Sequence, residues 1–492
     1  MPADGRTARR KSQPMIDIDF TLKRIFGKKT FRPLQREVIN AALDKHDIFL
    51  QAATSFGKSL CYQLPAVIDH GLTVVISPLL ALMNNQVAAL RAADIKVATI
   101  NSTTPYSQKT AIMEDLQCGH PRTRLLYITP EYCQLDSFRR ILRIIHTHRE
   151  LARIAVDEAH CISEWGHDFR PSFKNLSFFK HEFPDVPIIC LTATATAQVR
   201  DDIVRTLALD PATLKLYTMS TSRPNLHYEV RFKSDEEDHY DDFVRWLCAV
   251  QARRTADPER ASALRASGKR PEALSGIVYT LFRRSCEGLA ERLRASGIGA
   301  RPYHAGLSNA EKDAALSGWV ANAPGYEIVV ATTAFGMGID KEDVRFVVHW
   351  ELPKSFEGFY QEAGRAGRDG KAAACILYYS REDRDRAAGM MARDMPSECA
   401  GGGGVSAAME KHRSRAESLK KLVDYCEETR RCRHKMIAEY FGENGEAVPC
   451  EWACDWCKDA KALKRRKESG LASEEWCSTQ RESGAFADGD WD

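Results

Sequence analysis

The sequence predicts an α/β protein of two doubly wound lobes, each built on a parallel sheet, followed by a small helical piece with clustered cysteines. Short apolar runs alternate with helical patterns from about residue 20 to 210, and the same alternation returns from about 216 to 388. Five cysteines then fall between residues 424 and 457. A chain of 492 residues is also too long for one hydrophobic core.

The first lobe is predicted over residues 21–215. Its runs of Val, Ile and Leu without polar alternation are typical of strands that are covered on both faces. The elements expected in it are buried strands at 73–78, 124–130, 153–160 and 187–196 and helices at 80–92 and 197–207. In such a sheet the functional residues gather at the carboxyl ends of the strands.

The second lobe is predicted over residues 216–388. The strands expected in it are 276–281, 299–306, 327–333, 344–350 and 374–380. Residues 251–275 interrupt the pattern with charged, small, Pro and Gly residues, so we expect a flexible surface insertion there.

The remaining segments follow from composition. Residues 389–413 contain a run of glycines and are predicted to be a linker, and 414–458 form the cysteine-bearing helical subdomain. The basic start, 1–20, and the last segment, 459–492, have few apolar positions and are expected to be disordered. The basic run KRRK at 464–467 is either a nuclear-localisation signal or a solvated charge run.

The composition excludes several classes of protein. No run of about 18 apolar residues appears, and the start has no secretory signal, so neither a membrane span nor secretion is expected. Fifteen cysteines therefore lie in a reducing compartment, where clusters indicate metal binding. The net charge of +3 leaves room for a local basic groove that binds nucleic acid.

The stretch AATSFGKSLCYQLPA, residues 52–66, ends like a phosphate-binding loop before an apolar helix. Gly57 allows close approach of backbone N–H groups to phosphate, Lys58 places a point charge there, and Ser59 is a magnesium ligand. Ala52 replaces the usual first glycine, and Phe56 is acceptable only if its side chain points away from the nucleotide. The residues assigned to nucleotide binding are Thr54, Ser55, Phe56, Gly57, Lys58 and Ser59.

Two acids follow the apolar run RIAVDEAH at 153–160. Asp157, at the end of a buried strand, is expected to hold Mg²⁺, and Glu158 to orient or deprotonate the attacking water. An ordinary acidic strand end is the alternative. Two adjacent carboxylates at the mouth of a parallel sheet are costly without a cation, which favours the metal site.

A third element is FYQEAGRAGRDG at 359–370. On a helix, Arg365 and Arg368 would share one face, together with Gln361. Two arginines from the second lobe could complete a triphosphate site in the first, as arginine fingers do. By itself this segment fits surface arginines near a glycine turn better.

The cysteines are one more than a tetrahedral Zn²⁺ site needs. Cys450, Cys454 and Cys457 have a spacing typical of a metal knuckle, and the fourth ligand is Cys426 or Cys432. If 417–441 is one helix, these two lie about 240° apart around its axis and cannot both reach the ion.

From about residue 20 to 458 the chain resembles the RecQ family of DNA helicases in superfamily 2. The matching segments, in chain order, are FGKKTFRPLQREVI (26–39), GKSLCYQLPA (57–66), SPLLALMNNQV (77–87), ITPEY (128–132), DEAHCISEWGHDFRPSF (157–173), LTATAT (191–196), RPNL (223–226), YHAGL (303–307), ATTAFGMGIDKEDVRF (331–346) and QEAGRAGRDG (361–370).

The resemblance implies two tandem RecA-like lobes that bind ATP between them and a zinc-binding subdomain. It implies that Arg32 and Gln35 contact the adenine, and that Gly338 and Asp340 face the nucleotide across the cleft. Arg368 is then the finger. Cys432 becomes the zinc ligand, with Cys450, Cys454 and Cys457.

The resemblance also implies a single-stranded DNA track. Trp165 and Phe169 offer flat faces on which bases stack, worth about 1–3 kcal/mol each, although both could be core aromatics. The other nucleic-acid residues assigned are Ser77, Pro78, Thr129, Arg170 and His304. His160, Thr192 and Thr194 are implied to couple DNA binding to hydrolysis.

The predicted function is therefore an ATP-dependent 3′→5′ DNA helicase, nuclear, with ATP, Mg²⁺ and Zn²⁺ as cofactors and single-stranded and forked or duplex DNA as partner, acting in recombination or repair. Only 35 residues follow Cys457, too few for the winged-helix domain that often carries the strand-splitting hairpin. A translocase or annealing factor with weak unwinding is thus one alternative, and a non-catalytic DNA-binding protein is the other.

Overall fold

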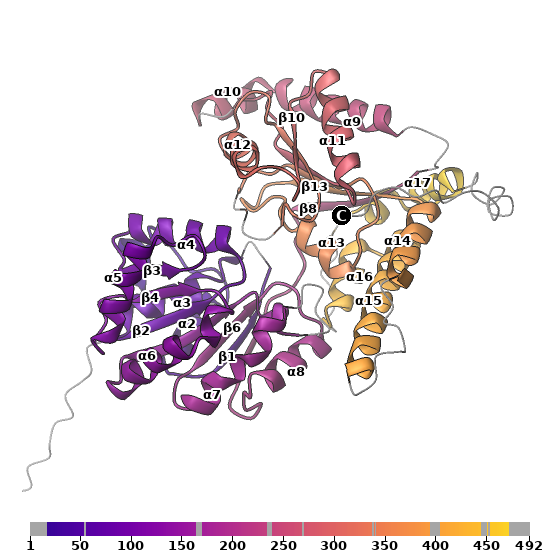
Figure 1. The fold of residues 1–492 in the computed structure, drawn as a ribbon. Helices are drawn as coiled ribbons and strands as arrows, with labels where there is room; N and C mark the ends of the chain where they lie inside the picture. Colours follow the sequence, from indigo (N-terminus) through magenta and orange to yellow (C-terminus); the bar gives the residue numbers. More distant parts are fainter. Residues whose placement is uncertain are drawn as a thin grey trace, which may run out of the picture.

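The computed structural model describes residues 17–53, 56–163, 170–233, 239–267, 270–336, 339, 341–393, 404–443, 450 and 453–471. Two parallel sheets, each covered by helices, form separate lobes, and a helical module packs beside the second lobe (Figure 1). This is the predicted fold class, and the prediction is confirmed.

Lobe 1 is a seven-stranded parallel sheet in the order β3-β4-β2-β5-β6-β1-β7. Its strands are β1 (Ile48–Gln51), β2 (Leu72–Ile76), β3 (Val97–Ile100), β4 (Leu125–Ile128), β5 (Leu151–Asp157), β6 (Ile188–Thr192) and β7 (Lys215–Thr218). Its helices are α1 (Ile18–Arg24), α2 (Gln35–Leu43), α3 (Leu60–Ile68), α4 (Leu80–Ala92), α5 (Tyr106–Gln117), α6 (Asp136–Thr147), α7 (Phe178–Glu182) and α8 (Ala197–Thr206). Strands β2, β5 and β6 are buried along their whole length, as continuous apolar runs require.

Lobe 2 is a six-stranded parallel sheet in the order β10-β11-β9-β12-β13-β8. Its strands are β8 (Leu226–Phe232), β9 (Gly276–Tyr279), β10 (Ala300–Tyr303), β11 (Ile328–Ala331), β12 (Phe346–His349) and β13 (Ala373–Tyr379). Its helices are α9 (Tyr240–Thr255), α10 (Pro258–Ala266), α11 (Arg283–Ala295), α12 (Asn309–Val320), α13 (Phe356–Ala363) and α14 (Arg381–Arg393).

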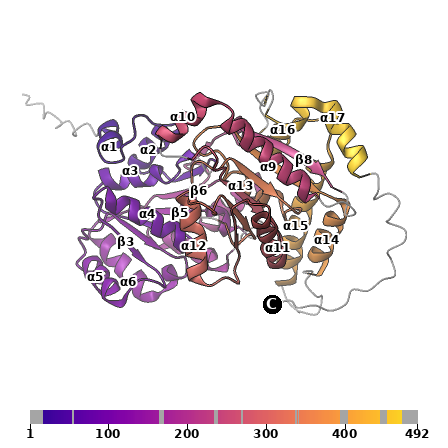
Figure 2. The same cartoon turned by 90° about the horizontal axis from the view of Figure 1, so that it is seen from above.

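The helical module consists of α15 (Gly404–Glu427), α16 (Arg433–Tyr440) and α17 (Asp455–Gly470). Helix α15 packs against α13 and α14, and α17 packs against β8 at the edge of the second sheet. Seen from above, α17 lies beside β8 (Figure 2). The module is therefore attached to lobe 2, and its apolar side chains belong to the same core cluster as those of β8, β13 and α13.

Every strand expected from the sequence is present, and four others were not expected: the short β1, β3 and β7 and the longer β8. Strand β7 pairs with β1, so the sheet of lobe 1 runs past the predicted boundary at residue 215. Because β7 is exposed and β3 alternates between buried and half-buried positions, neither has a continuous apolar run to reveal it.

Several predicted segment types are wrong. The insertion 251–275 is largely helical, because α9 extends to Thr255 and α10 packs on it. Helix α14 extends into the predicted linker and α15 begins inside it. Helix α1 starts within the predicted N-terminal tail, and α17 occupies the start of the predicted C-terminal tail.

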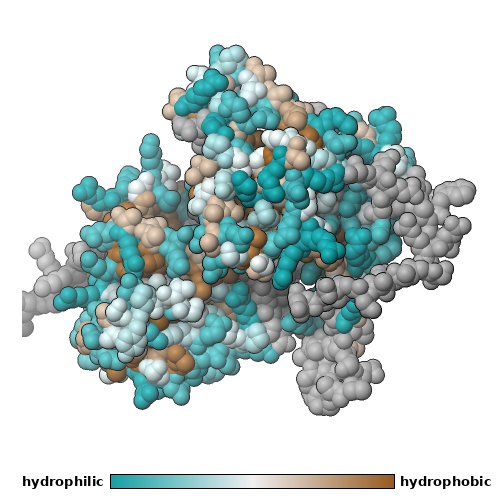
Figure 3. All heavy atoms as spheres, turned by 45° about the horizontal axis from the view of Figure 1, so that its top comes forward, coloured by the Kyte–Doolittle hydropathy of each residue, from teal (hydrophilic) through white to brown (hydrophobic). Residues whose placement is uncertain are grey.

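The face in Figure 3 is mostly hydrophilic, with apolar side chains in small groups. Among the described residues, no helix has both the length and the apolar character needed to cross a bilayer.

Candidate active site and thiol cluster

The candidate phosphate loop connects β1 to α3 at the carboxyl end of β1. Gly57 has φ +81°, a left-handed conformation that glycine adopts without strain. Lys58 is 8% exposed, and its Nζ donates to Ala52 O at 2.9 Å. Phe56 is buried in the apolar core of lobe 1. Its ring therefore packs inward, which is the condition under which this loop tolerates a phenylalanine.

A glutamine that the sequence assignment missed supports the magnesium candidate Ser59. Gln86, on α4, donates from Nε2 to Ser59 Oγ at 3.1 Å. Its Oε1 accepts from the hydroxyls of Tyr62 at 2.6 Å and Tyr127 at 2.8 Å. Gln86 lies within the segment SPLLALMNNQV, but nothing in its spacing indicates that it reaches the phosphate loop.

The two acids lie where β5 ends. Asp157 is its last residue, and Glu158 has φ +52°, a conformation that costs a non-glycine residue about 1–3 kcal/mol. Burial raises the pKa of Asp157 to about 7, the neighbouring Glu158 carboxylate adds to the rise, and Lys58 opposes it. A divalent cation would remove this penalty, so the arrangement suits a metal site.

The residues implied to couple DNA binding to hydrolysis lie together. His160 Nδ1 is 3.4 Å from Glu158 Oε2 and 3.0 Å from Thr192 Oγ1. Thr192 Oγ1 in turn accepts from Thr194 N at 3.2 Å. A chain of polar contacts thus joins Glu158 to the end of β6.

The two candidate finger arginines are arranged differently from the prediction. Helix α13 ends at Ala363, so Arg365 and Arg368 lie in the turns that follow it and do not share a helix face. The charges of both still act on Tyr279 of β9: burial raises the pKa of this tyrosine, and the two guanidinium groups oppose that rise. The glycines after α13 end the helix earlier than its spacing suggested.

The lobes meet at a cavity of about 450 Å³. Leu79 and Arg170 line it from lobe 1, and Tyr279, Gln361 and Arg365 are among the lobe 2 residues around it. The charge of Arg368 acts on Lys58 across the junction. Burial lowers the pKa of Lys58, and Arg368 adds to this shift, whereas the carboxylates of Glu158 and Asp157 oppose it. Groups from both lobes therefore act on one another in one polar region.

The adenine candidates lie beside the phosphate loop. Gln35 is buried, and its Nε2 donates to Phe56 O at 3.0 Å and to Gly57 O at 3.3 Å. Its Oε1 accepts from Arg32 N at 2.9 Å. The Arg32 side chain is exposed. Gln35 thus braces the loop backbone.

The DNA candidates among the described residues are buried or half-buried. Arg170 donates from Nη1 to Pro78 O at 3.0 Å, which ties the end of the aromatic loop to the segment before α4. Ser77 and Pro78 are buried, and Thr129 is half-buried. His304 is 3% exposed, and its Nε2 lies 2.9 Å from Glu287 Oε1. The contact of His304 with DNA stays a prediction, and this histidine is buried in the structure.

Six predicted site residues lie outside the described part of the chain. They are Thr54, Ser55, Trp165, Phe169, Gly338 and Asp340.

Four thiols converge in the helical module. Within the described ranges, Cys432, Cys450, Cys454 and Cys457 form a group whose sulfurs all lie within 4.8 Å of one another. Helix α15 ends at Glu427, so residues 417–441 are not one helix, and Cys432 is the N-cap of α16. Four thiols at this spacing suit tetrahedral Zn²⁺. Cys426 is buried on α15 outside this group.

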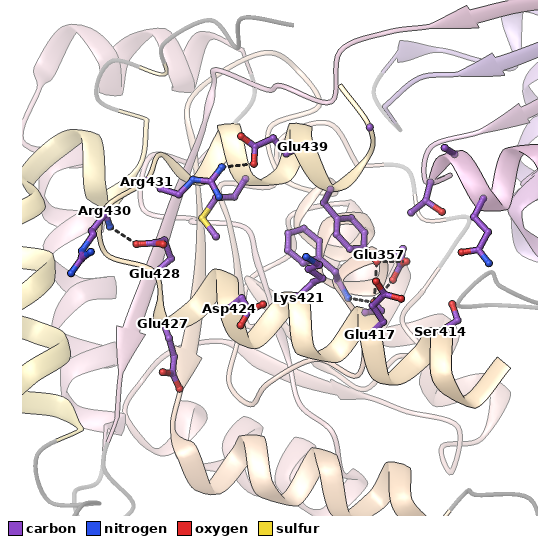
Figure 4. A pocket seen from close by; sticks show the side chains of 18 of the residues that line it. Glu357, Ser414, Glu417, Lys421, Asp424, Glu427, Glu428, Arg430, Arg431 and Glu439 are labelled. Atoms are coloured by element: carbon purple, nitrogen blue, oxygen red, sulfur yellow. Dashed lines mark hydrogen bonds and ion pairs between the residues drawn. The ribbon is translucent and has the colours of Figure 1, made fainter. Parts of the chain in front are cut away.

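A larger cavity of about 930 Å³ lies elsewhere, between α15, α16 and the start of α8. Figure 4 shows that its labelled side chains are mostly charged, with Glu417, Lys421 and Asp424 projecting from α15. None of the described residues that we assigned to nucleotide, DNA or zinc lines it. Its size alone therefore does not make it the active site.

Comparison with known proteins places these features in a family. The DEAD/DEAH box helicase model matches residues 32–203, the helicase conserved C-terminal domain model matches 264–370, and the RecQ zinc-binding model matches 381–458. ATP-dependent DNA helicase Q5 of Rattus norvegicus is 39% identical over 469 residues. This chain belongs to the RecQ family.

Other RecQ relatives match over the same span. ATP-dependent helicase SGS1 of Saccharomyces cerevisiae is 38% identical over 450 residues, which cover 90% of this chain and 28% of SGS1. RecQ-like DNA helicase BLM of Xenopus laevis is 38% identical over 90% of this chain and 30% of BLM. The rat Q5 match covers 93% of this chain and 45% of Q5. The chain thus spans less than half the length of these relatives.

Solved structures share the two-lobe fold. The helicase MrfA bound to DNA superposes with a TM-score of 0.56 at 18% identity, covering 74% of this chain and 51% of MrfA. S. cerevisiae Dbp5 bound to RNA and ADP BeF3 gives 0.54 at 14% identity, covering 91% of this chain and 96% of Dbp5. At these identities the likeness concerns the fold alone.

Proposed function

We propose that this RecQ-family chain is an ATP-dependent DNA helicase that translocates 3′→5′ on single-stranded DNA. One observation carries the proposal: Lys58, Asp157 and Glu158 of lobe 1 are buried, and the charge of Arg368 of lobe 2 acts on Lys58. A charge set divided between two lobes suits a triphosphate that binds between them. The names of the relatives, which are ATP-dependent DNA helicases, support the substrate.

Each side chain has a role that its environment supports. Lys58 would bind the β- and γ-phosphates, and Ser59 and Asp157 would hold Mg²⁺, which screens the phosphate charge when bound. Glu158 would take the proton of the attacking water, with His160 beside it to hold its orientation. Arg368, with Arg365 beside it, would stabilise the charge that develops on the γ-phosphate.

DNA would lie across the lobe 1 edge formed by the ends of β2 and β4. Arg170 would connect the strand to the ATP site, because it contacts Pro78 O and also lines the cavity between the lobes. Opening and closing of the lobes around ATP would then move the strand. Stacking of bases on Trp165 and Phe169 remains part of the proposal.

The four thiols would hold a structural zinc ion. Hydrogen bonding, above all with Cys454, lowers the pKa of the Cys432 thiol to about 4, whereas burial and hydrogen bonds within the cluster raise the pKa of Cys450, Cys454 and Cys457. A bound metal ion would favour the thiolate form of all four. A closed set of four sulfurs leaves no open position for substrate, so this ion would stabilise the module and take no part in hydrolysis.

Nuclear location and a role in recombination or repair belong to the same proposal. The relatives compared above come from eukaryotes, in which chromosomal DNA lies in the nucleus. The basic run at 464–467 lies on α17, where Arg466 pairs with Glu229 at 2.8 Å and Lys467 donates to Glu427 O at 2.5 Å. Lys464 also pairs with Glu468 at 3.8 Å, so three of its four charges make internal contacts.

The test is ATP hydrolysis with and without single-stranded DNA, in the wild type and in Lys58→Ala. We expect DNA to stimulate the wild type and the variant to be inactive. As a control, Lys96→Ala changes a 72%-exposed lysine side chain and should leave the rate unchanged. Equal rates in the wild type and Lys58→Ala would reject the proposal. Unwinding of a forked duplex then separates a helicase from a translocase.

A further inference from the structure

The segment between the lobes contains an arginine to which the proposed mechanism gives no role. Arg223 lies between β7 and β8, and only 7% of it is exposed. Its Nη1 donates to Gly364 O at 2.9 Å, and its Nη2 donates to Ala366 O at 2.9 Å and to Gly367 O at 2.8 Å. One guanidinium group thus binds three backbone carbonyls.

Those carbonyls belong to the turn that carries the candidate finger arginines. Residues 364–367 include Arg365 and lead directly into Arg368. Gly367 has φ +55°, and a Cβ added there would lie 2.6 Å from Asn225 Nδ2. Asn225 itself donates to Gly367 O at 2.9 Å and to Lys371 O at 3.0 Å. The segment between the lobes therefore holds this turn at several points.

The chemistry of these contacts suits a positioning role. A buried carbonyl that loses its donor is destabilised, so the turn depends on the guanidinium group. A planar fork with five N–H groups can reach carbonyls that diverge from one another, whereas a lysine ammonium is a compact point donor. Arg223 thus fixes the path of the backbone on which the finger guanidinium groups are mounted.

The same segment is also attached to the thiol-bearing module. Glu443, which follows α16, accepts from Ser220 Oγ at 2.8 Å and from Thr221 N. Tyr360 of α13 donates from its hydroxyl to Thr221 O at 3.0 Å. Residues 220–225 therefore contact the arginine turn and the module at once.

We propose that Arg223 is a positioning residue for ATP hydrolysis. It holds the 364–367 turn so that Arg368 reaches the γ-phosphate, and Glu443 ties this support to the thiol-bearing module. The inference rests on the proposed function, because it assigns a support to the finger of that same site. Arg223 itself touches neither nucleotide nor DNA in this scheme.

The test is a double-mutant cycle on DNA-stimulated ATP hydrolysis with the full chain. We expect Arg223→Ala to lower kcat at least tenfold and to change the affinity for a non-hydrolysable ATP analogue less than threefold. In Arg223→Ala/Arg368→Ala, kcat should fall no further than in Arg368→Ala. Arg231→Ala, a control at a similarly buried arginine of β8 that pairs with Glu229, should leave kcat within threefold.

Two further variants keep the test decisive if Arg223→Ala does not fold. Arg223→Lys keeps the charge but not the fork, and Gly367→Ala strains the turn while leaving Arg223 intact; both should lower kcat with little change in analogue affinity. Losses that multiply in the double variant would overturn the inference while the proposed function stands. A wild type without DNA-stimulated hydrolysis would overturn both.

Discussion

Both the ATP site of lobe 1 and the thiol-bearing module bury charge, but they satisfy it differently. In the module, the fully buried Arg433 donates from Nε to Asp455 Oδ1 at 2.9 Å and from Nη2 to Oδ2 at 3.2 Å, and Asp455 also accepts from Val230 N. In lobe 1, Lys58 is nearly as buried, yet among the described residues no carboxylate lies within 4 Å of its Nζ.

The first arrangement is typical of a structural site, and the second is typical of a ligand-binding site. A paired and hydrogen-bonded ion pair fixes two segments against each other, and removing one partner is strongly destabilising. Buried charges without close partners raise the free energy of the folded state, and a bound anion and cation would offset this cost. We therefore expect changes in the module to act on stability and changes in the ATP site to act on rate.

The largest effect should come from the thiol cluster. Cys454→Ser removes one sulfur of the four, and structural zinc contributes on the order of 10 kcal/mol to the folding of small zinc modules. We expect loss of bound zinc and a clear fall in melting temperature. Cys426→Ala, which removes a buried cysteine outside the cluster, should retain zinc; equal zinc contents in the two variants would contradict the ligand set.

Arg368→Ala should change the rate of hydrolysis and leave the stability of the protein unchanged. An arginine finger contributes about 10³–10⁵ to kcat, so hydrolysis should fall by that factor while the melting temperature stays the same. Steady-state hydrolysis with saturating DNA measures the rate. Arg384→Ala, at a partly exposed arginine of α14, is the matched control. A loss of stability without a loss of rate would place Arg368 among the structural residues.

Glu158→Gln should give the next largest loss. Removal of the group that accepts the proton lowers kcat by about 10²–10⁴, and nucleotide binding should persist because the amide keeps the shape of the side chain. Titration with a fluorescent ATP analogue checks binding in parallel. Glu182→Gln, on α7 at the surface of lobe 1, serves as control. Unchanged hydrolysis in Glu158→Gln would remove this acid from the mechanism.

The raised pKa of Asp157 predicts a smaller, pH-dependent effect in the protein without nucleotide or Mg²⁺. Its pKa is about 7 in the folded chain and near 3.8 when exposed, so the folded state binds the proton more tightly. Stability contributed by this group is therefore lost as pH rises from about 4 to 7. Asp157→Asn should melt above the wild type by a margin that grows over this range and then levels off. A margin that does not change with pH would contradict the burial.

The smallest effect is expected from Tyr440→Phe, which tests the contact between the module and lobe 2. The Tyr440 hydroxyl donates to Glu357 Oε1 at 2.5 Å, and Ser418 Oγ donates to Glu357 Oε2 at 2.6 Å. Loss of one donor to this buried carboxylate should cost about 1–3 kcal/mol without changing kcat. Chemical denaturation measures the cost, with the exposed Tyr106→Phe as control. An unchanged free energy of unfolding would show that the contact does not bind the module.

Residues that act through sequence-local chemistry were predictable. The apolar runs of β2, β4, β5 and β6 indicated buried parallel strands, and Asp157 and Glu158 lie at the carboxyl end of β5. Lys58 was predictable from the Gly57-Lys58-Ser59 sequence, although the strand β1 before it was not expected. The spacing of Cys450, Cys454 and Cys457 likewise indicated a metal knuckle. In each case a few residues that are close in the sequence determine the predicted feature.

Other features were not predictable because they depend on contacts between distant segments. Gln86 and Arg223 act through partners tens to more than a hundred residues away. Helix α10 lies in the segment predicted to be a flexible surface insertion, because its apolar periodicity is weak. Pro258 at its first position and the Ala, Leu and Arg residues that follow nevertheless favour a helix. The end of α13 at Ala363 differs from the prediction, in which the helix continued through Gly364 and Gly367.

The most direct test of the central claim is a mixing experiment. Lys58→Ala and Arg368→Ala are assayed for DNA-stimulated ATP hydrolysis alone and in equal mixture. If one chain supplies both groups to one triphosphate, each variant and the mixture should be inactive. Recovery of hydrolysis on mixing would mean that the arginine comes from a second chain, and full activity of either variant would mean that the two lobes do not form one site.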